Sequence, residues 1–255
     1  MIKKLRFSMF FMLASLFSVL VLVGCGGGDV KLLERMVSNE STVVFEYDNK
    51  NRVVTIENYR NSGGSEWLQN KRTIEYSDDG NLITVTTLKQ TDNVTSFVVN
   101  SNIVTYNRPR AYDGTITLTE LGYIGKSEGN SWGSPENKTY KYQDGNLTSM
   151  TSVSESFDPE KDAAIMFKIV VKREYDNRKT PLHNSATPKW LLQYLFEGIT
   201  GTGTFIYNNN VTKYEHIDNY SSSNVTFQYE YDAYGFPTKF TSTGTISEKS
   251  TFAYQ

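Results

Sequence analysis

The sequence predicts an all-β protein, an antiparallel meander of roughly eight β-hairpins with one short helix near residues 188–197. Two observations support this fold class. Aromatic residues make up 13% of the 255 residues, and Asn, Gly and Asp separate short stretches in which apolar and polar residues alternate. Alternation with a period of two is typical of strands with one buried face. Asn, Gly and Asp favour the tight turns that join antiparallel strands.

The first segment directs and anchors the chain. Three basic residues lie among the first six, and an uncharged stretch over 7–23 is followed by Gly24 and Cys25. This arrangement resembles the signal peptide of bacterial lipoproteins, which is removed before a cysteine that carries lipid. We therefore expect residues 1–24 to be a signal peptide and Cys25 to be lipidated. The alternatives are an ordinary secretory signal and an uncleaved anchor.

The remainder of the chain is expected to form one domain. Residues 25–41 would hold the lipidated Cys25 and a tether, and residues 42–255 a single β-hairpin domain. By analogy with lipoprotein sorting, Gly26 favours the outer membrane, with the domain either periplasmic or surface-exposed. A single cysteine excludes an internal disulfide, and a net charge of −2 gives no basic footprint for nucleic acid.

One short motif recurs through the body of the chain. It consists of two aromatic or apolar residues flanking one other residue, then a polar turn, then an alternating segment. Copies recur every 20 to 30 residues, so each corresponds to about one hairpin. The clearest copies begin at Phe45, Ile74, Tyr140, Phe205 and Tyr229.

The copy over 229–235 resembles the YD repeat of Rhs-type and teneurin-type proteins. The chain as a whole resembles a group of uncharacterised Gram-negative lipoproteins with degenerate YD-like hairpins. Matching residues lie at 175–177, 209–211 and 231–239. The resemblance implies an array of hairpins on a lipid anchor and implies no particular activity. Whether the sheet forms a barrel, a sandwich or an open layer stays open.

The helix is predicted from its own start and stop signals. Pro188 suits the first helical position and Gly198 ends the segment. We expect this helix to plug an open end of the sheet or cover its apolar face, because an uncovered face would aggregate. The alternative is a mobile lid over a ligand cavity. The apolar stripe consists of Trp190, Leu191, Tyr194 and Leu195.

Catalytic and metal-binding motifs are weakly supported. Residues 129–133 match the Gly-x-Ser-x-Gly pattern of serine hydrolases around Ser131, but the flanking residues do not predict the required strand and helix. His183 and His216 have no metal-site spacing. We therefore predict a protein that is not an enzyme, with no catalytic residue, no metal and no cofactor; a hydrolase using Ser131 is the alternative.

Trp67 and Trp132 are the candidate ligand-binding residues, because both lie outside the regular strand pattern and tryptophan stacks well on sugar rings. Packing in the core or in loops is the alternative for both. The function that we predict is a non-catalytic, outer-membrane-anchored lipoprotein with a structural or binding role. Its expected partners are the membrane, through lipid on Cys25, and a glycan or an envelope protein. The alternatives are a carbohydrate- or small-ligand-binding surface lipoprotein and a carrier of apolar ligands.

Overall fold

The structure is a computed structural model. It describes residues 30–255, except 63–64, 89–92, 108–112, 132–133, 159–162, 198–204 and 246. Cys25 and Trp132 therefore lie outside the described residues, and so do the signal peptide expected over 1–24 and the first part of the tether. Residues 31–255 form one compact unit.

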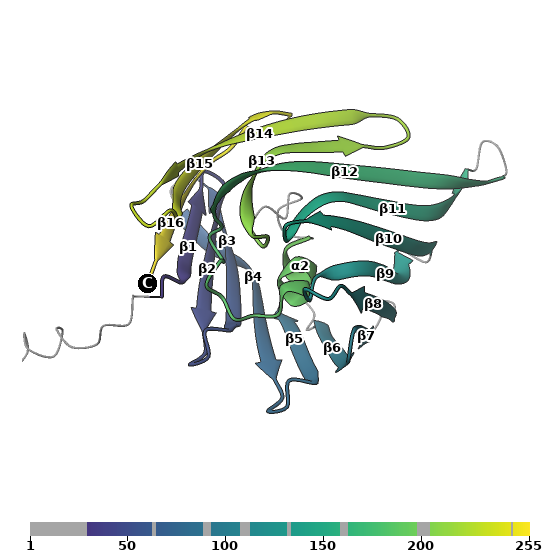
Figure 1. The fold of residues 1–255 in the computed structure, drawn as a ribbon, viewed down its shortest axis with the longest axis horizontal. Coiled ribbons are helices and arrows are strands. Elements are labelled where there is room, and N and C mark those ends of the chain that lie inside the picture. The colour runs from purple at the N-terminus through teal and green to yellow at the C-terminus, as the bar shows by residue number, and fades with distance from the viewer. Residues whose placement is uncertain are drawn as a thin grey trace, which may run out of the picture. The chain divides into compact units, whose positions relative to one another are not determined.

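Within the described residues, sixteen antiparallel strands form one closed barrel (Figure 1). Each strand pairs with the strands before and after it in the chain, and β1 closes the barrel by pairing with β16. The strands are β1 (Leu33–Ser38), β2 (Ser41–Tyr47), β3 (Val53–Ser62), β4 (Ser65–Tyr76), β5 (Leu82–Leu88), β6 (Asn93–Asn100), β7 (Ile103–Asn107), β8 (Gly114–Leu118), β9 (Ile124–Ser131), β10 (Ser134–Gln143), β11 (Asn146–Asp158), β12 (Ala163–Lys179), β13 (Asn209–Ile217), β14 (Ser222–Tyr231), β15 (Pro237–Gly244) and β16 (Lys249–Tyr254).

The all-β antiparallel meander with one short helix is confirmed, and three details are corrected. Consecutive strands form more than the roughly eight hairpins expected, because every strand pairs with both of its chain neighbours. β1 lies within 25–41, so the barrel begins inside the segment that the sequence assigned to the tether. The motif copy at 205–207 is a turn that precedes β13 and not a strand.

The inner face of the barrel is mainly apolar and the outer face is polar. In β14, Val225 and Phe227 are buried, whereas Thr226 and Gln228 between and beside them are exposed. The same alternation runs through most strands and produces a core rich in Phe, Ile, Leu, Val and Tyr. A barrel of sixteen strands is wider than wall side chains alone can fill. Its interior therefore has room for either a channel or another element of the chain.

The helix α2 (Lys189–Glu197) lies inside the ring of strands (Figure 1). Phe196 stacks on Phe45 of β2 at 5.9 Å between ring centroids, and Trp190 packs 5.4 Å from Phe97 of β6. The Gln193 side chain accepts hydrogen bonds from Ile124 N at 3.1 Å and from the Tyr142 hydroxyl at 3.0 Å. The helix thus contacts inward-facing residues from several parts of the wall and acts as a plug.

The segment before α2 crosses one end of the barrel, which we call the turn end. The turn end carries the turns at 48–52, 77–81, 119–123, 144–145 and 232–236, and the points where β1 begins and β16 ends. Two hydrogen bonds join this segment to the turn end, from Asn184 Nδ2 to Lys31 O at 3.0 Å and from Ala186 N to Asn51 O at 2.9 Å. A third joins the first turn of α2 to the same end, from Trp190 N to Gly122 O at 3.1 Å.

A tyrosine paired with a β-bulge explains the recurring motif. Tyr175, near the end of β12, donates a hydrogen bond from its hydroxyl to Leu147 O on β11 at 2.7 Å. Immediately after Leu147 the register between β10 and β11 shifts, because Lys141 pairs with Ser149 and Tyr142 with Leu147. The extra residue, Thr148, bends the strand, and the tyrosine hydroxyl bonds the carbonyl beside the bulge.

The same device occurs at five further places around the turn end. The donors, each paired with an acceptor carbonyl beside a register shift on the preceding strand, are Tyr47 with Leu33, Tyr76 with Val53, Tyr142 with Ile124, Tyr229 with Val211 and Tyr254 with Pro237. The pairings β4–β5 and β6–β7 have no register shift. Correspondingly, β6 and β8 end in Asn100 and Leu118 and not in the aromatic motif.

The aspartate that follows the aromatic pair organises the turn. Asp48 Oδ1 accepts hydrogen bonds from Lys50 N and Arg52 N, each at 2.9 Å. Asp232 Oδ1 accepts from Tyr234 N and Phe236 N, again each at 2.9 Å. The Tyr-Asp signature therefore has a structural basis, with tyrosine bonding a carbonyl beside a bulge and aspartate bonding the amides of a tight turn.

Candidate functional site

The outer wall of the barrel carries polar and charged side chains on many strands, together with exposed apolar residues such as Leu82, Val98 and Ile103. Outward-facing ion pairs join neighbouring strands, with Glu57 to Lys71 at 2.7 Å between β3 and β4 and Glu230 to Lys239 at 2.6 Å between β14 and β15. The hydrogen bond from Lys71 lowers the pKa of Glu57, so this carboxylate is charged at neutral pH. Charged groups thus occur on the wall itself and not only on its rims.

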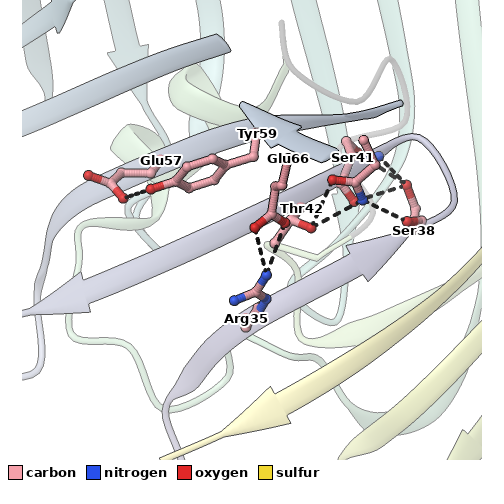
Figure 2. A network of polar contacts seen from close by, with 8 residues as sticks. Arg35, Ser38, Ser41, Thr42, Glu57, Tyr59 and Glu66 are labelled. Carbon is pink, nitrogen blue, oxygen red and sulfur yellow. Dashed lines mark hydrogen bonds and ion pairs between the residues drawn. The ribbon is translucent and has the colours of Figure 1, made fainter. Parts of the chain in front are cut away.

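Figure 2 shows one part of this wall. Arg35 of β1 bonds Glu66 of β4 at 2.9 Å, and the Tyr59 hydroxyl donates to Glu57 at 2.6 Å. Hydrogen bonding from Thr42, together with the Arg35 charge, lowers the pKa of the Glu66 carboxyl. The network spans β1 to β4, so polar and charged side chains connect the outer faces of four adjacent strands.

A groove of about 620 Å³ lies on the outer wall across β6 to β10. Its outward-facing residues form one row that the strand register aligns, in which Val98 pairs with Thr105, Thr105 with Thr115 and Thr115 with Glu128. Asn137 continues the row on β10. Ser96, Asn107 and Asp113 complete the polar lining.

Two glycines form the floor of the groove. A side chain at Gly114 or Gly129 would point into the barrel, and the Tyr106 side chain occupies that space. A Cβ added to Gly114 would lie 2.2 Å from the Tyr106 ring, and one added to Gly129 would lie 2.7 Å from its hydroxyl. Tyr106 itself packs on Phe97 and on Tyr194 of α2, at 6.0 and 5.8 Å between ring centroids. The helix therefore supports the groove floor from inside.

The lining chemistry suits a neutral ligand that offers hydroxyl groups. Small hydroxyl and amide side chains provide hydrogen-bond donors and acceptors, and the carboxylates of Asp113 and Glu128 disfavour an anionic ligand. Glu128 is partly balanced by Lys126 on the same strand. Val98, which is 51% exposed, adds an apolar surface that continues to its cross-strand neighbour Leu82, which is 46% exposed.

Of the two predicted binding residues, Trp67 is described and does not line this groove. Trp67 belongs to β4, contrary to the expectation that it falls outside a regular strand, and it pairs with Arg60 of β3. It is 48% exposed, so it is not a core residue. Trp132 lies outside the described residues. The sequence alternation predicts that Thr105, Thr115 and Glu128 face outward. It does not predict which strands form the groove.

Ser131 is the last residue of β9 and pairs with Ser134, the first residue of β10. A nucleophile elbow requires a strand followed by a helix, whereas both flanks here are antiparallel strands. In the described residues, Ser131 therefore lies at the end of an antiparallel strand and not at a junction between a strand and a helix.

Other chemistry is sparse among the described residues. In that part of the chain, no three His, Cys, Asp or Glu side chains form a group that could hold a metal ion. Burial, followed by the charges of Lys189 and Lys179, lowers the pKa of His183. Where the chain is described, none of its helices has the length and apolar character needed to cross a membrane.

The fold and the site together describe a closed antiparallel barrel with an internal helix and an external polar groove. Neither known family models nor curated proteins match the chain. Among solved structures, it is similar to a porin-like protein from Bacteroides uniformis with a TM-score of 0.54 and 14% identity, covering 88% of this chain and 96% of that chain. A porin-like protein from Bacteroides vulgatus gives a TM-score of 0.41 at 12% identity, covering 88% and 99% of the two chains. At 14% identity, the first likeness establishes the fold alone.

Proposed function

We propose that the protein is a non-catalytic binding lipoprotein of the outer membrane, anchored by lipid on Cys25, with its barrel outside the bilayer. The observation that carries this proposal is the charged outer wall. A membrane-spanning barrel presents an apolar band about 25 Å tall to lipid, and a Lys or Arg at its midplane costs about 2–4 kcal/mol. Here the pair of Glu57 and Lys71 lies on the outer wall in the middle of β3 and β4, and the pair of Glu230 and Lys239 lies on the wall across β14 and β15.

The filled interior supports the same proposal. A pore needs a continuous hydrated lumen, whereas α2 and the segment that leads to it pack apolar residues into this barrel and cover its turn end. The described barrel therefore combines charged groups on its wall with an apolar interior that holds a helix, and both features support a position outside the bilayer. Attachment to a membrane then depends on the N-terminal segment, whose Gly24-Cys25 junction motivates lipidation.

The test is to replace residues 1–25 with a cleavable secretory signal that has no lipidation cysteine. We expect the mature barrel to leave the membrane fraction and to stay folded and monodisperse without detergent. The wild-type protein, measured in parallel, should stay in the membrane after a high-pH wash. If the unlipidated barrel also resists that wash, the barrel itself is in the bilayer and the proposal is wrong.

The external groove favours a carbohydrate as the ligand class. Asn137, Thr105 and Glu128 align donors and acceptors beside the apolar Val98, and sugars present hydroxyl groups next to apolar ring faces. The unlipidated barrel should be titrated with a panel of oligosaccharides by calorimetry. Asn137→Ala should weaken any binding at least several-fold, whereas Thr226→Val on the exposed wall of β14 should not. Equal effects of both changes would exclude the groove.

A further inference from the structure

The turn end of the barrel has two halves of opposite charge. One half, which we call the basic sector, comprises residues 31–32, 48–52, 176–184 and 232–236. The other half, the acidic sector, comprises the turns 77–81, 101–102, 119–123 and 144–145. The strand order places β12 to β16 and β1 to β3 consecutively around the barrel, so each sector is contiguous.

The two sectors differ in composition. The acidic sector contains neither Lys nor Arg. Its four acidic residues are Asp78, Asp79, Glu120 and Asp144. The basic sector contains five Lys or Arg residues against three aspartates. The cations are Lys31, Lys50, Arg52, Arg178 and Lys179, and the aspartates are Asp48, Asp176 and Asp232.

The aspartates of the basic sector are engaged within the fold. Asp48 bonds Arg52 at 2.6 Å, and Asp232 bonds Lys31 at 2.7 Å. Asp176 accepts hydrogen bonds from Asn210 and from the Tyr231 hydroxyl. Lys50, Arg178 and Lys179, by contrast, are exposed. The two ion pairs engage Arg52 and Lys31 as well as the aspartates, so the sector keeps an excess of two positive charges, and the cations outside these pairs are the exposed ones.

Aromatic side chains lie among these cations. Tyr234 is 69% exposed, and Lys31 Nζ lies 4.5 Å from the centroid of its ring. Lys179 Nζ lies 4.8 Å from the Phe236 ring. Exposed tyrosine beside Lys and Arg is the composition of protein surfaces that contact the headgroup region of a bilayer.

Chain length brings this sector close to the membrane. If Cys25 carries lipid, only residues 26–30 separate it from Lys31, so Lys31 can lie at most about 20 Å from the bilayer surface and can approach it much more closely. Within a Debye length of about 8–10 Å, an anionic membrane attracts Lys and Arg and repels the four carboxylates of the acidic sector. The charge asymmetry would tilt the barrel so that the basic sector lies closer to the membrane than the acidic sector.

We propose that the basic sector of the turn end docks on an anionic lipid surface and sets a tilted orientation of the barrel. This inference rests on the proposed lipid anchor at Cys25. In this orientation the groove residues Asn107, Asp113 and Gly129, which lie toward the opposite end of their strands, face away from the membrane. The groove would then be open to ligands in the surrounding solution.

The experiment measures amine labelling of individual lysines in the lipidated full mature protein. The protein is reconstituted on vesicles of phosphatidylcholine alone or mixed with phosphatidylglycerol, and the mature chain with Cys25→Ser in buffer is the reference. We expect labelling of Lys50 and Lys179 to fall several-fold on phosphatidylglycerol vesicles only and to recover at high salt. Lys126 and Lys239, which are 46% and 40% exposed on the wall, should label equally in all conditions.

Two other outcomes overturn the inference, and they differ in what they say of the proposed function. Unchanged labelling of all four lysines on both vesicles would mean an anchored barrel that does not dock. Protection of Lys126 and Lys239 on both vesicles would mean that the barrel is inserted, which would also reject the proposed function. Arg178→Glu should abolish the lipid-dependent protection of Lys50, and Lys141→Glu on β10 is the matched control that should preserve it.

Discussion

Arg72 of β4 donates a hydrogen bond from Nη1 to the carbonyl oxygen of Leu195 at 2.7 Å, in the last turn of α2. The helix has no basic residue of its own in that turn. A cation at this end interacts favourably with the helix dipole and bonds one of the carbonyls that the helix cannot satisfy. The barrel wall thus supplies the C-terminal cap of the plug.

Arg72→Met is expected to destabilise the barrel by about 1.5–3 kcal/mol, the range for a hydrogen bond to a charged group. The measurement is urea unfolding followed by tryptophan fluorescence, since Trp190 lies on the helix. Lys71→Met, one residue away on the outer face, removes a partly exposed ion pair with Glu57 and should cost less than about 1 kcal/mol. Equal losses for both variants would mean that Arg72 does not cap the helix.

The tyrosine–bulge device predicts a cost for removing a single oxygen. Tyr175→Phe keeps the ring but leaves Leu147 O without its 2.7 Å hydrogen bond, so stability should fall by about 1 kcal/mol. Tyr220→Phe is the control, because Tyr220 is 78% exposed and should tolerate the change. A Tyr175→Phe variant as stable as the wild type would show that the hydroxyl adds nothing to the ring packing.

These devices show what the sequence could and could not predict. The motif beginning at Phe45 predicted strands and turns, because alternation and turn residues act locally. The function of Tyr47 and its equivalents was not predictable, since each hydroxyl bonds a carbonyl on a neighbouring strand. Closure was likewise hidden, because it depends on β1 pairing with β16 across the whole chain.

The candidate site follows the same division. The outward direction of Thr105 and Thr115 follows from alternation, but the groove forms only where Gly114 and Gly129 leave the wall without inward side chains and Tyr106 takes that space. The sequence drew attention to Trp67 because it was expected to lie outside the regular strand pattern and because tryptophan stacks on sugar rings. Neither property reports where a wall is hollow.

Buried tyrosines predict a loss of stability at high pH. Burial raises the pKa of Tyr76 to about 12, whereas a tyrosine in the unfolded chain titrates near 10. The neutral hydroxyl is favoured in the folded state, so its contribution is complete below pH 10 and is lost as the pH rises toward 12. Urea unfolding across this range should show a falling free energy, and Tyr76→Phe should reduce the slope. A flat profile in the wild type would contradict the prediction.

The turn aspartates predict the opposite behaviour at low pH. Burial by itself would raise the pKa of Asp232, but hydrogen bonds from Lys31 and from the Phe236 and Tyr234 amides outweigh it, and the pKa is lowered. Its stabilisation is therefore complete above the usual pKa near 4 and is lost as the pH falls below it. Asp232→Asn should make unfolding less dependent on pH between about 2 and 4. Asp78→Asn, on an exposed turn residue, serves as the control.

The groove floor predicts a steric cost at Gly114. In Gly114→Ala the new methyl would lie 2.2 Å from the Tyr106 ring, which is held by Phe97 and Tyr194, so the ring cannot move away freely. Overpacking of this kind costs about 1–3 kcal/mol, measurable by urea unfolding. Thr115→Ala, the next residue along on the outer face, should change stability by less than about 0.5 kcal/mol.

Adding Tyr106→Ala to Gly114→Ala tests the cause: the alanine at 114 should be nearly neutral once the ring is gone. If Gly114→Ala still destabilises the protein when the Tyr106 ring is absent, the strain lies in the backbone of β8 and the ring does not pack behind the groove floor.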